Sequence, residues 1–108
     1  MEPAEGRFRA LLQGRALGDT RKALRVSEGS YDDVLYFPKE DLDMTLFAPS
    51  DHSSHCPFKG DASYWSATLD GIVKENIAWS YEAPFIEAQV LEGFVAFCTD
   101  KLDDLVEE

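Results

Sequence analysis

The chain has 108 residues, a length typical of one domain, so a two-domain enzyme is excluded. Apolar residues make up 44% of the chain and aromatic residues 12%, which is enough for a hydrophobic core and argues against disorder. The 21 acidic residues outnumber the 10 basic ones and give a net charge of −11. Because bare nucleic acid and anionic membranes attract basic surfaces, we expect neither as a partner.

The charge is unevenly distributed along the chain. Residues 1–25 contain six basic and three acidic residues, a sum of +3, so residues 26–108 carry −14. One interpretation is a solvated basic pair of strands beside acidic loops. The other is an anion-binding pocket, which would be lined by one of four arginines: Arg7, Arg9, Arg15 or Arg25.

The sequence shows no membrane span or secretion signal. No stretch approaches the roughly 20 apolar residues of a transmembrane helix, and Met1 leads into acidic residues and a proline rather than a basic and then apolar signal region. The two cysteines, Cys56 and Cys98, are too few for a disulfide framework or a four-cysteine zinc site. These features predict a soluble cytoplasmic protein whose cysteines are reduced.

Short strands dominate the first half of the chain. The expected strands cover residues 8–13, 22–27 and 34–37, and they end at Gly14, at Glu28-Gly29 and at Pro38. Residues 38–42 then predict about one helical turn, 44–47 a further strand, and 49–60 a loop rich in Pro, Ser, Asp and His.

A hairpin is the most specific structural signal. Strands over 62–69 and 72–81 flank Asp70-Gly71, whose glycine suits the positive φ of a tight turn. If Leu69 faces Ile72, Tyr64 lies opposite Ile77 and Ala62 lies opposite Trp79. This register would place Tyr64, Ala62, Ile77 and Trp79 on one core face.

The C-terminal third predicts a short helix over 85–92 that ends at Gly93, and then a buried strand over 94–98. Thr99 or Asp100 is expected to cap a closing helix whose apolar residues are spaced three and four apart: Leu102, Leu105 and Val106. The chain is thus expected to be a compact single domain, 1–108, mainly β, with six to eight short antiparallel strands and short helices near the C-terminus.

Most of the reactive side chains lie within residues 51–60. The segment holds both histidines, His52 and His55, together with Cys56, Lys59 and Asp51. A zinc site would use His52, His55 and Cys56 with Asp51, but adjacent residues seldom converge on one ion and paired cysteine knuckles are missing, so no metal is expected.

A thiol enzyme would use Cys56 as the nucleophile, activated by His55 or Lys59. The alternative is structural, with Cys56 packed as a small apolar residue and the histidines bonded to loop carbonyls. Because only Asp61 separates Gly60 from the next strand, the loop is expected to lie against the hairpin. Lys59 would then sit near a Tyr or Trp at the mouth of a concavity.

Several strings of this sequence resemble the family catalogued as domain of unknown function 427, over about residues 22–102. They are Tyr36-Phe37-Pro38-Lys39-Glu40-Asp41, Pro49-Ser50-Asp51-His52, His55-Cys56-Pro57-Phe58-Lys59-Gly60, Ala62-Ser63-Tyr64-Trp65, Trp79-Ser80-Tyr81-Glu82-Ala83-Pro84 and Gly93-Phe94-Val95-Ala96-Phe97. The resemblance implies a β-tent fold with a topology similar to Mss4-like proteins. The family is sometimes labelled nucleotidyltransferase-like, but the sequence has no acidic pair after a Gly-Ser turn to hold magnesium.

Two functional hypotheses follow. The first is a non-catalytic module that binds a small molecule or peptide and needs no cofactor. The predicted ligand-binding residues are Tyr36, Asp51, His52, Lys59, Trp65, Trp79 and Tyr81. The alternative is a small enzyme with the thiol site of Cys56, His55 and Lys59.

Overall fold

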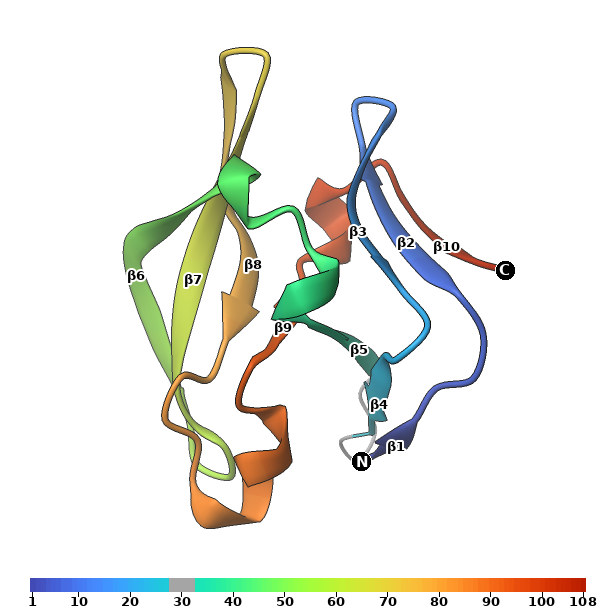
Figure 1. Ribbon diagram of the computed structural model, residues 1–108. Helices are drawn as coiled ribbons and strands as arrows, with labels where there is room; N and C mark the ends of the chain where they lie inside the picture. Colours follow the sequence, from blue (N-terminus) through green and yellow to red (C-terminus); the bar gives the residue numbers. More distant parts are fainter. Residues whose placement is uncertain (28–32) are drawn as a thin grey trace.

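The computed structural model describes residues 1–27 and 33–108, which fold into two antiparallel sheets (Figure 1). The larger sheet has the strand order β1-β4-β5-β9-β8-β7-β6, and the smaller has the order β10-β2-β3. The strands are β1 (Glu2–Pro3), β2 (Phe8–Leu12), β3 (Arg15–Thr20), β4 (Leu24–Val26), β5 (Val34–Pro38), β6 (Phe47–Cys56), β7 (Gly60–Leu69), β8 (Ile72–Ser80), β9 (Phe94–Phe97) and β10 (Asp104–Glu107). The mainly β prediction is confirmed.

Four short 3-10 helices connect the strands: η1 (Lys39–Asp41), η2 (Met44–Leu46), η3 (Ile86–Leu91) and η4 (Thr99–Lys101). In the described part of the chain, no helix is long and apolar enough to cross a lipid bilayer. The helical turn predicted after Pro38 and the helix before Gly93 are both present, the latter as η3. Gly93 has the left-handed conformation expected after a helix end, with φ of +85°.

The main hydrophobic core lies between the two sheets. Alternate residues of β2 are buried, as expected for a strand with one face on a core: Phe8, Ala10 and Leu12. They share one cluster with Phe37 of β5 and Phe97 of β9, whose rings meet edge to face at 5.3 Å. The three-stranded sheet is therefore held on the larger one by apolar contacts at its centre.

A second apolar cluster covers the opposite face of the larger sheet. Its aromatic members are Tyr36, Tyr64, Trp79 and Tyr81, and Leu91 of η3 packs against it. Both faces of the sheet are thus covered, which explains why its central strand β9 is buried along most of its length.

Three segments differ in secondary structure from the sequence prediction. Residues 44–46 form η2 rather than a strand, because the carboxylate of Asp43 accepts the Thr45 N–H at 3.2 Å and caps a turn. Residues 47–56 form the edge strand β6 rather than a loop, and its side chains are mostly exposed, so they carry no apolar alternation. Residues 104–107 form β10 rather than a closing helix, because they pair with the free edge of β2.

The structure also contains one strand that was not predicted and one that is shorter than predicted. Strand β3 was not predicted, since Gly18 and polar residues interrupt its pattern. The strand expected over 22–27 is limited to β4, and the turn expected at Glu28-Gly29 lies outside the described residues.

The hairpin over 62–81 is confirmed, with Leu69 paired with Ile72 as expected. Its register then shifts by two residues. Between the pairs Ala67–Lys74 and Trp65–Ala78, β7 has one residue, Ser66, whereas β8 has three. The predicted pairings of Tyr64 with Ile77 and Ala62 with Trp79 are therefore wrong, and Tyr64 pairs with Trp79 instead.

Gly18 marks a close approach between β3 and the segment after η1. Gly18 bridges to Leu42, and the Asp43 N–H donates to the Leu17 carbonyl at 3.1 Å. A Cβ atom at Gly18 would overlap Cδ2 of Leu42 and would lie 3.1 Å from Cδ2 of Phe37. The site thus has no room for a side chain, and the glycine is required by packing.

We predict that Gly18→Ala lowers the free energy of unfolding by about 1–3 kcal/mol, because the added methyl overpacks the core. The measurement is urea denaturation. The cost should shrink in a Leu42→Ala background, since that change removes the overlapping atom. Equal costs in both backgrounds would show that Leu42 is not the constraint.

A polar network joins η1 to β7 and to the end of β8. The Trp65 indole N–H donates to Oγ of Ser80 at 2.9 Å, and that hydroxyl donates to Glu82 at 2.9 Å. The other carboxylate oxygen of Glu82 is 2.6 Å from Nζ of Lys39, which lies 5.1 Å from the Trp65 ring centre. Burial raises the pKa of Glu82, but the bonds from Lys39 and Ser80 outweigh it and lower the pKa overall.

We predict that Glu82→Gln lowers the unfolding midpoint at pH 7 and flattens the acid side of the stability profile. Because the native pKa of Glu82 is below its usual value of about 4.3, its stabilisation is present above that pH and is lost as pH falls through the native pKa. Thermal melts from pH 7 to pH 3 measure the effect. Glu87→Gln on exposed η3 is the control, and identical profiles for the two variants would contradict the prediction.

Candidate functional site

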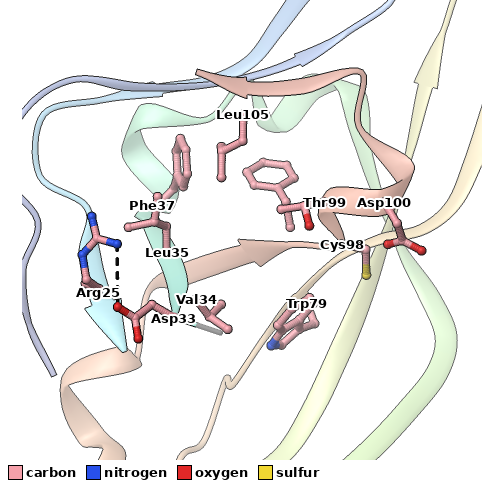
Figure 2. Close-up of a pocket in the computed structure, with 11 residues that line it drawn as sticks. Arg25, Asp33, Val34, Leu35, Phe37, Trp79, Cys98, Thr99, Asp100 and Leu105 are labelled. Atoms are coloured by element: carbon pink, nitrogen blue, oxygen red, sulfur yellow. Dashed lines mark ion pairs between the residues drawn. The ribbon is translucent and has the colours of Figure 1, made fainter. Parts of the chain in front are cut away.

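A pocket of about 390 Å³ opens where β5 and β9 separate (Figure 2). Residues 36–38 of β5 pair with β9, whereas residues 34 and 35 of β5 do not. After Phe97 the chain leaves the sheet and forms η4. The pocket thus occupies the position where a longer β9 would have continued.

Backbone hydrogen bonds fix this departure of the chain. The Cys98 N–H donates to the Ile77 carbonyl at 2.7 Å, and the Lys101 N–H donates to the Cys98 carbonyl at 2.9 Å. The chain then enters β10, which carries Leu105 across the pocket from the other sheet. One wall of the pocket therefore belongs to each sheet.

The lining of the pocket is mostly apolar. Leu105 lies at the top and Trp79 at the bottom of Figure 2. Phe37 of β5 and Phe97 of β9, whose rings meet edge to face, also line the pocket. The remaining apolar lining residues are Val34 and Leu35. Such a surface suits an apolar body in a ligand.

A few polar groups complete the lining. Asp33 lies 3.9 Å from Arg25 and accepts a hydrogen bond from Ser27 at 2.7 Å. Thr99 and Asp100 lie on η4, and both are exposed. Polar groups in an otherwise apolar pocket give orientation and specificity to a bound ligand.

Cys98 contributes a thiol that is poorly suited to catalysis. Its Sγ donates to the Asn76 carbonyl at 3.4 Å. Burial is the largest effect on the Cys98 pKa and raises it; Lys101 lowers the pKa and Asp100 raises it further. The thiol is therefore mainly protonated at neutral pH, and the protonated form is a weak nucleophile.

Of the seven predicted ligand-binding residues, Tyr36, Trp79 and Tyr81 come together in the second apolar cluster. Tyr36 and Trp79 meet edge to face at 6.5 Å. Tyr36 is 2% exposed and Tyr81 is 7% exposed, and burial raises the pKa of both hydroxyls. These tyrosines fill the sheet face as packing, while the half-buried Trp79 also reaches the pocket.

Asp51 and His52 line a different, more polar hollow of about 560 Å³, together with Glu75 and Asn76. Asn76 has a positive φ of +54° at the irregularity in the β7–β8 pairing, and its N–H donates to Oγ of Ser66 at 3.1 Å. The hollow is the result of two irregular strand pairings that lie next to each other.

Trp65 and Lys59 lie apart from both of these hollows. Trp65 belongs to the polar network with Ser80 and Glu82. Lys59 lies in the turn between β6 and β7, where it is 4% exposed, and burial lowers its pKa. Its carbonyl accepts the Phe85 N–H at 2.8 Å, which ties this turn to the segment before η3.

In the predicted thiol site, the side chains of Cys56 and His55 do not come together. Adjacent residues of an extended strand point to opposite faces, so His55 and Cys56 diverge on β6. Nδ1 of His55 lies 2.7 Å from Asp61, whereas Cys56 packs in the second apolar cluster and interacts with Tyr81. In residues 1–27 and 33–108, no three His, Cys, Asp or Glu side chains are grouped as a metal site would require.

The four arginines named as candidates for an anion pocket fit the solvated interpretation better. Arg7 pairs with Asp19 and with Glu108, Arg9 pairs with Glu108, and Arg25 pairs with Asp33. Arg15 lies exposed next to the β2–β3 turn. The positive charges of Arg7, Arg9 and Arg25 are thus already compensated by carboxylates.

Sequence reasoning missed most residues that line the pocket. It found Trp79 and named Arg25 in another role, but it did not single out these as ligand contacts: Asp33, Leu35, Phe37, Phe97, Cys98, Asp100 and Leu105. Their apolar members read as ordinary strand residues. The only available signal was the short apolar run over 94–98 followed at once by polar residues, which marks where β9 ends.

A family model described as domain of unknown function (DUF427), with the label NTP_transf_9, matches residues 1–108. The match is longer than the range of 22–102 expected from the sequence strings. No curated protein matches the chain. On the strength of the family model, which spans every strand of both sheets, this chain belongs to the DUF427 family.

Proposed function

We propose that this domain is a non-catalytic binding module that holds a small organic molecule in the pocket between β5, β9 and β10. The observation that carries the proposal is the pocket itself, whose volume of about 390 Å³ lies within the usual range for ligand sites. Its apolar walls come from both sheets and meet a few polar groups at η4. Compact apolar ligands of modest size fit such a site.

The chemistry of the lining favours binding over catalysis. Among the described residues of the lining there is no histidine or lysine, and burial raises the pKa of its thiol, Cys98. A nucleophilic thiol would need a lowered pKa, which is the opposite of what burial does to Cys98. Free thiols at both Cys56 and Cys98 support a cytoplasmic location, which is also part of this proposal.

We predict that indole, a neutral aromatic probe, binds in this pocket with weak, millimolar-range affinity and shifts the NMR signals of Leu35, Trp79 and Leu105. Val34→Phe places a larger side chain in the lining and should weaken binding at least tenfold. Val73→Phe is the matched control, because it makes the same change on the exposed β7–β8 hairpin. Equal binding by the two variants, or shifts spread over the whole surface, would contradict the proposal.

A thiol-labelling experiment tests the enzyme alternative. Because Cys98 has a raised pKa and both thiols are half-buried, we predict that iodoacetamide at pH 6.5 modifies Cys56 and Cys98 much more slowly in the folded than in the unfolded protein. Mass spectrometry of the two peptides measures each rate. Rapid labelling of Cys56 alone in the folded protein would favour a thiol enzyme.

A further inference from the structure

The charges around the pocket between β5 and β9 are not balanced. Among the residues that the structure describes, two carboxylates line it, those of Asp33 and Asp100, against the one guanidinium of Arg25. Arg25 lies 3.9 Å from Asp33, so its charge is already opposed by a carboxylate. Within residues 1–27 and 33–108, this leaves Asp100 as the carboxylate of the lining that has no charged partner.

The nearest basic residue in the sequence does not line the pocket. Nζ of Lys101 donates to the carbonyls of Glu75 and Asn76, at 2.9 and 3.4 Å, and is therefore held against β8. The wider field has the same sign as Asp100, since residues 26–108 carry −14. An anionic ligand would meet repulsion both in the pocket and on approach to it.

The apolar walls have the right chemistry for a cation. The lining contains the half-buried ring of Trp79, whose negative face can attract a cation, and the more deeply buried rings of Phe37 and Phe97. Trp79 and Asp100 both line the cavity, on β8 and η4 respectively. Apolar and aromatic walls together with one free carboxylate are suited to a ligand with an apolar body and a positive charge.

We propose that the pocket selects organic cations, such as amines with an aromatic or aliphatic body, over neutral and anionic molecules of the same shape. This inference rests on the proposed binding function. Asp100 supplies the charge selectivity from the exposed end of the pocket, while the rings hold the apolar part of the ligand. Arg25 remains with Asp33 and does not recruit an anion.

Three probes with one indole ring and different side chains test the inference. They are tryptamine, which is cationic at pH 7, tryptophol, which is neutral, and indole-3-propionate, which is anionic. We expect tryptamine to bind about tenfold more tightly than tryptophol, and indole-3-propionate to bind most weakly, in NMR titrations at low salt. Added salt should reduce the advantage of tryptamine.

Asp100→Asn should remove most of the advantage of tryptamine over tryptophol and leave the affinity for tryptophol unchanged. Asp70→Asn, at the tip of the β7–β8 hairpin, removes the same charge outside the pocket lining and serves as the control. The three probes binding equally, the anion binding best, or the two variants losing the same affinity would each overturn the charge preference. Failure of all three probes to bind would instead overturn the proposed binding function.

Discussion

The edge-to-face contact between Phe37 and Phe97 is the interaction on which the rest of the structure depends. Phe37 is fully buried and Phe97 is 4% exposed, and together they join β5 to β9 and meet the inner face of the three-stranded sheet. The same two rings line the pocket. The core and the candidate site therefore share their residues, and a change that loosens this pair is expected to disturb both.

The strands that have an apolar pattern or a defined turn could be predicted from the sequence, and those that depend on partners could not. The Asp70-Gly71 turn and the helix end at Gly93 both require residues with positive φ, and both are predicted from the sequence and present in the structure. Strand β6 has exposed side chains on both faces, so its sequence resembles a loop. Strand β10 has helical spacing, and only the free edge of β2 explains why it is extended.

The candidate site was predicted less well for a related physical reason. The sequence predicts Tyr36 and Tyr81 as ligand-binding residues, but their rings are buried in the second apolar cluster together with Leu91 of η3. The pocket arises instead from the point where β9 stops pairing with β5. The end of a pairing depends on the whole sheet, and no local residue pattern specifies it.

Trp79 connects the irregular hairpin to the pocket. Two extra residues of β8 at the Asn76 irregularity shift the β7–β8 register by two positions, so Trp79 pairs with Tyr64 rather than with Ala62. Because side chains alternate with a period of two, this even shift keeps Trp79 on the face predicted for it. The shift brings Trp79 next to the rings of Tyr64 and Tyr36, whose centres lie 6.4 and 6.5 Å from the centre of the Trp79 ring. Trp79 also pairs with Ala96, the second-last residue of β9, and it therefore lies next to the pocket. The irregularity thus changes the position of Trp79 along β7 but not the face of the sheet on which its side chain lies. As a result, a half-buried aromatic ring lines the pocket at a position that another residue would occupy in a regular hairpin.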